Sequence, residues 1–180
     1  MEKLIALSAI GRDRPGIVAA LSRVLFEKGC NLEDSSMTRL KGDFAVLLLL
    51  SLPEGLTPDG LRAALDPAVR DWNLALTLRP LAPGEMEPSP TGDPYTLVVY
   101  GLDHPGIVHR VTRAAADRGL NITDLRTHVT EGTGAPLYSL VVDLESPGKG
   151  AAEAFQADLE ALKKELQVEV TFHPAETDEL

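Results

Sequence analysis

The chain has 180 residues, a formal net charge of −10 at pH 7 and one cysteine, Cys30. A single cysteine excludes an internal disulfide and is typical of a reducing, cytoplasmic compartment, and no apolar run is long enough to span a membrane. A strongly acidic chain without a cluster of lysine and arginine binds phosphate backbones poorly, so we expect no direct contact with nucleic acid.

The first half of the chain alternates between strand-like and helix-like patterns. Apolar runs of strand length predict strands over residues 3–10, 31–40, 44–52 and 72–79. Apolar positions spaced by three and four residues predict one helix over residues 15–28 and a second that begins at Pro58, with Thr57 as its N-cap. We also expect Pro15 to occupy the first helical position, where a missing N–H costs nothing.

The predicted strand over residues 44–52 contains the most apolar stretch of the chain, residues 45–50. Side chains alternate between the two faces of a strand, so a sheet covered on one side only should show a polar residue at every second position here. We therefore expect the second face of this strand to be covered by the other half of the chain or by another chain. The alternative is that these leucines are simply exposed.

Residues 80–94 interrupt the pattern with five prolines, two glycines and no periodicity. Proline-rich segments are extended and semi-rigid, and they bridge domains without forming secondary structure themselves. We therefore predict a first domain over residues 1–80, a linker over residues 81–94 and a second domain over residues 95–173.

The second half of the chain repeats the order of the first. Its apolar patterns predict strands over residues 96–102, 121–130, 137–144 and 167–172 and helices over residues 105–118 and 151–166. The turn over residues 131–136 is four residues longer than its counterpart in the first half. Residues 174–180 are expected to form an acidic, poorly ordered tail.

One stretch of the chain occurs twice, 90 residues apart. Gly-Arg-Asp-Arg-Pro-Gly-Ile-Val over residues 11–18 matches Gly-Leu-Asp-His-Pro-Gly-Ile-Val over residues 101–108 at six of eight positions, and the offset persists at later glycines and asparagines. A shared spacing of this length indicates a tandem duplication. Each half is a βαββαβ unit, which predicts an α+β protein of two ferredoxin-like domains, each an antiparallel sheet with helices on one face.

The repeated stretch joins a strand to a helix through a turn of ligand size. Open N–H groups at a helix start attract a carboxylate or phosphate, and Gly16 and Gly106 let a ligand approach the backbone closely. Asp13 and Asp103 lie beside these N–H groups, where a carboxylate accepts hydrogen bonds from an ammonium group. This combination suits the zwitterion of an amino acid. The alternative is that each aspartate is only a helix N-cap.

No pattern in the chain points to catalysis, a metal or a cofactor. The four histidines show no metal-ligand spacing with cysteine or carboxylates. No serine lies in a nucleophile-elbow sequence, and no phosphate-binding glycine loop of the nucleotide-binding kind is present. We therefore expect a protein that is not an enzyme and needs no cofactor.

The repeated turn, followed about 13 residues on by Gly-x-Asn-[Leu/Ile]-x-Asp, resembles the ACT domain, a regulatory module that binds amino acids. In ACT domains that bind amino acids, the asparagine of this motif contacts the ligand across a domain interface. The resemblance therefore implies a ligand-binding set of Asp13, Gly16, Ile17, Asn31, Asp103, Gly106, Ile107 and Asn121. Asparagine after a helix is also a common left-handed stop, which is the alternative for these two asparagines.

Two ACT domains without a catalytic domain are similar to regulatory members of this family. The resemblance implies a sensor of a small amino acid, glycine or serine, that acts on a transcriptional regulator by protein contact. The alternative is a detached regulatory subunit of an amino-acid or folate-linked metabolic enzyme. We expect a homodimer, because domains this small bury a modest fraction of their surface. Gly11 and Gly101 stand where some serine-binding relatives carry histidine, which leaves a different or differently oriented ligand open.

Overall fold

The computed structural model describes residues 3–82, 85, 92–103, 105–130 and 136–175. The chain divides into two compact units, Met1–Glu87 and Pro88–Leu180. Parts of the predicted linker, of the long turn and of the acidic tail lie outside the described residues, at residues 83–84, 86–91, 131–135 and 176–180. The bounds of the domains and of the linker therefore stay a prediction.

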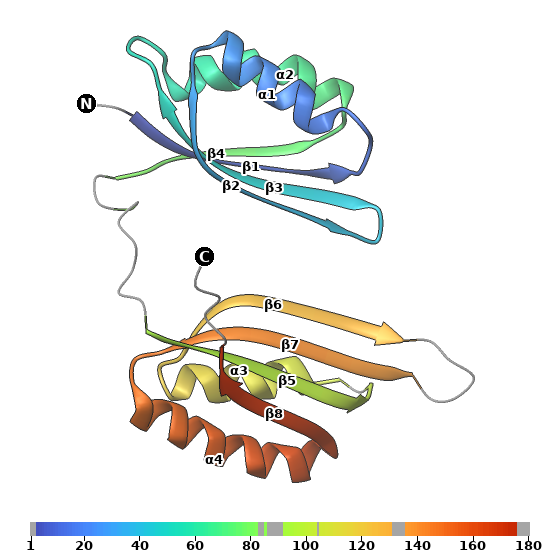
Figure 1. The fold of residues 1–180 in the computed structure, drawn as a ribbon. Coiled ribbons are helices and arrows are strands. Elements are labelled where there is room, and N and C mark those ends of the chain that lie inside the picture. Colours follow the sequence, from blue (N-terminus) through green and yellow to red (C-terminus); the bar gives the residue numbers. More distant parts are fainter. Residues whose placement is uncertain (1–2, 83–84, 86–91, 104, 131–135, 176–180) are drawn as a thin grey trace. The chain divides into compact units, whose positions relative to one another are not determined.

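The first unit is a four-stranded antiparallel sheet with two helices (Figure 1). Its elements in chain order are β1, Lys3–Arg12; α1, Ile17–Glu27; β2, Asn31–Leu40; β3, Asp43–Leu52; α2, Pro58–Asp71; and β4, Ala75–Pro80. The strands lie in the order β2-β3-β1-β4, which makes β2 and β4 the edges of the sheet. Both helices cover the same face of the sheet (Figure 1).

The second unit repeats this architecture. Its elements in chain order are β5, Asp93–Leu102; α3, Ile107–Asp117; β6, Asn121–Thr130; β7, Leu137–Ser146; α4, Lys149–Leu166; and β8, Val168–Pro174. The strand order is β6-β7-β5-β8, and a register shift falls at the same place in both edge strands, before Asp34 in β2 and before Asp124 in β6. The predicted α+β fold of two ferredoxin-like units is confirmed.

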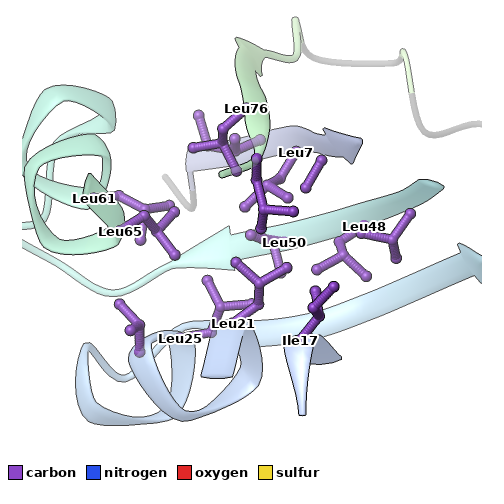
Figure 2. Close-up of a cluster of buried hydrophobic side chains, with 14 of the residues drawn as sticks. Leu7, Ile17, Leu21, Leu25, Leu48, Leu50, Leu61, Leu65 and Leu76 are labelled. Carbon is purple, nitrogen blue, oxygen red and sulfur yellow. The ribbon is translucent and has the colours of Figure 1, made fainter. Parts of the chain in front are cut away.

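The core of the first unit lies between the sheet and its helices. Figure 2 shows side chains of the sheet meeting side chains of both helices in one cluster: Leu7, Ile17, Leu21, Leu25, Leu48, Leu50, Leu61, Leu65 and Leu76. Burial of each large aliphatic side chain stabilises the fold by about 1.5–3 kcal/mol. Because α1 contributes Ile17 from its first turn, this packing also fixes where the helix begins relative to the end of β1.

Helix α2 begins where the sequence predicts, and the strand after it begins later than predicted. The Thr57 hydroxyl accepts a hydrogen bond from a first-turn backbone N–H at 3.1 Å, so the predicted N-cap is confirmed. The strand predicted over residues 72–79 begins only at Ala75. Trp72 is the C-cap of the helix, and Asn73 turns the chain through a left-handed conformation with φ 50°.

The second face of β3 carries no cover from the helices of its own unit. Leu47 points to this face and is 50% exposed, while Ala45 and Leu49 are partly buried. Leu48, on the helix-facing side, is buried. The expectation that another domain or another chain covers this open face stays a prediction.

Candidate functional site

The repeated stretch forms the same turn in both units. The Asp13 N–H donates to a hairpin carbonyl 2.9 Å away, and the Asp103 N–H donates to the matching carbonyl of the second unit at 3.1 Å. Gly16 and Gly106 are the N-caps of α1 and α3, both with φ 103°, a left-handed conformation that favours glycine. The N–H groups of a first helical turn lack acceptors within the helix, so each turn is a candidate site for a carboxylate.

The two aspartates are not helix caps. Each helix has glycine as its N-cap, with no side-chain capping hydrogen bond, so the N-cap interpretation of Asp13 and Asp103 is wrong. The prediction that Pro15 occupies the first helical position is also wrong. The helix begins two residues later, at Ile17, because Gly16 takes a positive φ that no helical residue has.

Asp13 pairs with an arginine from the neighbouring edge strand. Nη1 of Arg39 donates to Oδ2 of Asp13 at 3.3 Å, and the two side chains are 68% and 28% exposed. The carboxylate that was expected to receive a ligand ammonium therefore already faces a cation in the first unit. Sequence reasoning missed Arg39, because the two residues are 26 positions apart and meet only through the register of β2 on β3.

The second unit holds different residues at the matching register positions. Val129 lies opposite Tyr138 there, whereas the first unit has Arg39 opposite Phe44. Tyr138 is 8% exposed, and its pKa is raised, first by burial and then by the negative charge of Asp103. The Asp103 carboxylate therefore lies within electrostatic reach of a phenol, where its counterpart meets a guanidinium.

Asn31 lies at the opposite end of its sheet from Asp13. The register places Asn31 beside Ser51 on β3, while β1 ends beside Asp43. These two β3 positions are eight residues apart, which corresponds to ~26 Å along the strand. Asn121 begins β6 in the same way in the second unit. Within one unit the aspartate and the asparagine are not brought together, so a ligand that touches both needs residues from more than one unit.

The Asn31 side chain belongs to a small polar cluster. It donates to Oε1 of Glu33 at 2.8 Å, and the Ser51 hydroxyl donates to the same oxygen at 2.6 Å. The bond from Ser51, followed by the bond from Asn31, lowers the pKa of Glu33. The left-handed residues after the first helices are Gly29, with φ 69°, and Gly119, with φ 73°, so the interpretation of the asparagines as left-handed stops is wrong.

Gly11 and Gly101 lie where the neighbouring chain leaves no room for a side chain. A Cβ at Gly11 would lie 2.7 Å from Cδ2 of Leu74, and one at Gly101 would lie 2.8 Å from Cγ1 of Val168. Packing against the neighbouring chain therefore requires glycine at these positions, whatever ligand the turn binds.

Ile17 and Ile107 open the two helices with buried side chains, so each offers the turn its backbone and not its side chain. Among the described residues, no group of three or more histidine, cysteine, aspartate and glutamate side chains is placed to hold a metal ion. No helix in the part of the chain that the structure describes is long and apolar enough to cross a membrane.

Comparison with known proteins assigns both units. Models of the ACT domain match residues 3–78 and residues 95–169. The glycine cleavage system transcriptional repressors of Escherichia coli and Shigella flexneri are each 27% identical over 174 residues, covering 92% of this chain and 86% of theirs. The crystal structure of an unknown protein from Galdieria sulphuraria is similar with a TM-score of 0.82 and 28% identity, over 98% of this chain and 100% of that one. The chain therefore belongs to the ACT domain family, with one ACT domain in each unit.

Proposed function

We propose that this chain is an amino-acid-sensing regulatory protein that binds glycine or serine and acts on a transcriptional regulator by protein contact. The observation that carries the proposal is that two ACT domains account for residues 3–78 and 95–169, in a chain similar over 92% of its length to a transcriptional repressor. In this proposal the protein is not an enzyme and uses no cofactor.

The amino acid binds at the strand-to-helix turn. Its carboxylate accepts hydrogen bonds from N–H groups at the start of α1 or α3, and its ammonium donates to the aspartate of the same turn. Charge-assisted hydrogen bonds of this kind contribute about 1.5–3 kcal/mol each. The candidate residues for these contacts are Asp13, Gly16 and Ile17 in the first unit and Asp103, Gly106 and Ile107 in the second.

Asn31 and Asn121 contact the ligand only from a neighbouring ACT unit, because each lies at the far end of its own sheet. Removal of either asparagine is therefore expected to weaken both ligand binding and the association between ACT units. Removal of the aspartate of an occupied turn is expected to weaken ligand binding alone.

The protein acts in the cytoplasm as a homodimer. The edge strand β2 supports this part of the proposal, because all ten of its residues are exposed and Leu32, Met37 and Leu40 are at least half exposed. An exposed edge strand that carries apolar side chains is a ready template for pairing with another chain. The net charge of −10 supports a protein partner rather than nucleic acid or a membrane surface.

Affinity capture from the native cytosol, with and without added glycine or serine, tests the partner. We expect a DNA-binding transcriptional regulator to be retained, in an amount that changes when the amino acid is added. Retention of an amino-acid or folate-linked metabolic enzyme instead would support the detached regulatory subunit. Retention that is the same with and without the amino acid would contradict the sensing role.

A further inference from the structure

We infer that the two turns are not equal receptors: the second unit holds the amino acid at Asp103, and the first unit, where Arg39 neutralises Asp13, does not. This inference rests on the proposed function and assigns its site to one of the two units. The residue that makes the difference is the second-last residue of each edge strand, which is Arg39 in β2 and Val129 in β6.

The first turn already satisfies its carboxylate within the fold. Arg39 reaches Asp13 at 3.3 Å, and next to this pair Arg12 reaches Asp43, also at 3.3 Å. An incoming ammonium would have to displace the Arg39 guanidinium from Asp13 and would then lie near two positive charges, those of Arg39 and Arg12. Exposed ion pairs of this kind are individually weak. The amino acid is therefore kept out of the first turn by the sum of the local charges and not by one pair.

The matching positions of the second turn carry no such pairs. The strand registers equate Arg12, Arg39 and Asp43 with Leu102, Val129 and Leu137. Four matched positions therefore hold two arginines and two aspartates in the first unit, for a formal charge of zero. In the second unit they hold Asp103 alone, for a formal charge of −1. An ammonium group is attracted to the second arrangement and gains nothing from the first.

The second turn also offers a polar group that the first lacks. Tyr138 replaces Phe44, and the Asp103 charge acts on its phenol. Tyr138 pairs with Gly101, two residues before Asp103, so its phenol adds to this end of the sheet a hydrogen-bonding group that phenylalanine cannot supply. His104, which takes the sequence position of Arg14, lies outside the described residues, so the comparison rests on the other matched positions.

Calorimetric titration with glycine and with serine tests the assignment. The wild-type chain should bind one amino acid per chain. Asp103→Asn, an isosteric change of an exposed residue, should lower the affinity at least tenfold. Val129→Arg should do the same by giving Asp103 the partner that Asp13 has.

The reverse exchange makes the test reciprocal. Arg39→Val should open the first turn and raise the stoichiometry toward two per chain, and Asp13→Asn in that background should remove the added site. Arg23→Gln is the matched control, because it removes one positive charge from an exposed position on α1 and should leave stoichiometry and affinity unchanged. A thermal melt of each variant checks that it is folded.

Three outcomes overturn the inference. Two equivalent sites in the wild type, or wild-type affinity in Asp103→Asn, would show that the amino acid binds elsewhere or in both turns, with the proposed sensing function intact. No binding of glycine, serine or any other amino acid to the folded wild type would overturn the proposed function and this inference together.

Discussion

At the scale of single residues, two glycines set where the first helix of each unit begins. Gly16 and Gly106 have φ 103° with ψ −11° and −10°, so the duplicated turns have almost the same backbone. A residue with a Cβ is strained in this region by about 1–3 kcal/mol. The side chains around the turns have diverged, whereas the backbone that presents the N–H groups has not.

Close approach of two strands gives a residue-scale prediction at Gly101. Gly101→Ala should lower the free energy of unfolding of the second unit by about 1–3 kcal/mol, because its Cβ would meet Val168 side-chain and backbone atoms. Gly150→Ala is the matched control: nothing lies within 4 Å of its added Cβ, and it sits near the start of α4. It should raise stability by about 0.4–1 kcal/mol. All three tyrosines lie in the second unit, so their near-ultraviolet signal in urea reports both changes.

At the scale of elements, β3 separates its two faces sharply. Leu48 faces the helices and is buried, whereas its neighbour Leu47 faces away and is half exposed. The strand pairs with β1 on one side and β2 on the other, so it is a central strand of the first unit. The same substitution at Leu48 and at Leu47 therefore measures how much burial on the helix-covered face contributes to the free energy of unfolding.

Leu48→Lys should unfold or nearly unfold the first unit. An unpaired ammonium buried at this position costs several kcal/mol, which is comparable with the whole stability of a small domain. Leu47→Lys should cost well under half as much. Trp72, the one tryptophan, lies in the first unit, so its fluorescence during urea unfolding follows this unit. Equal losses for the two variants would show that both faces of β3 are covered.

An ion pair joins the two helices of the second unit and gives a pH-dependent prediction. Arg118 donates to Asp158 through two nitrogens, at 2.7 Å and 2.9 Å. These hydrogen bonds, with the charge of Arg118, lower the pKa of Asp158. Because its folded-state pKa lies below its unfolded value, Asp158 stabilises the fold above about pH 4, and this contribution is lost as the pH falls through the folded-state pKa.

Asp158→Asn should therefore lower the melting temperature of the second unit at pH 7, and this loss should shrink as the pH is lowered to 2. Asp117→Asn is the control, because Asp117 pairs with Arg113 within one helix and does not join α3 to α4. It should lower the melting temperature less. A loss in Asp158→Asn that is the same at both pH values would mean that packing, and not charge, carries the effect.

At the scale of the whole molecule, duplication has kept the fold and changed the surface. The open sheet face of the second unit carries Asp143 between Thr96 and Arg126, at 2.9 Å and 3.0 Å. The matching β1 and β3 positions of the first unit are Ala6 and Leu49. The first unit therefore has the more apolar open face, which suits contact with protein more than contact with water.

The charge of the whole molecule predicts that the isolated protein does not recognise DNA. DNA binding releases counterions when lysine and arginine side chains neutralise phosphates, and a chain with net charge −10 is poorly suited to this. A gel-shift assay with duplex DNA and no added partner should show no retarded band at micromolar protein. A salt-sensitive complex at lower concentration would contradict this prediction and the proposal that the protein acts through a partner.

The sequence predicts the helices, the strands and the position of the two turns. It does not predict contacts that depend on the register between strands distant in the sequence. The repeat identified both turns, and helical spacing predicted the buried faces of α1 and α2. The exclusion of Asp13 as a cap could not be predicted, because it depends on the positive φ of Gly16. The Arg39–Asp13 pair and the distance between Asp13 and Asn31 both follow from how β2 lies on β3, which local patterns do not contain.

The central claim is that the folded chain binds a small amino acid, and a thermal-shift screen of the wild type against the twenty amino acids tests it most directly. Ligand at a hundredfold excess over its dissociation constant stabilises the folded state by about 2.7 kcal/mol, which raises a small domain's melting temperature by several degrees. We predict that glycine or serine raises the melting temperature of at least one unit, followed by Trp72 fluorescence for the first and tyrosine absorbance for the second. No shift of either transition with any of the twenty amino acids would contradict the claim.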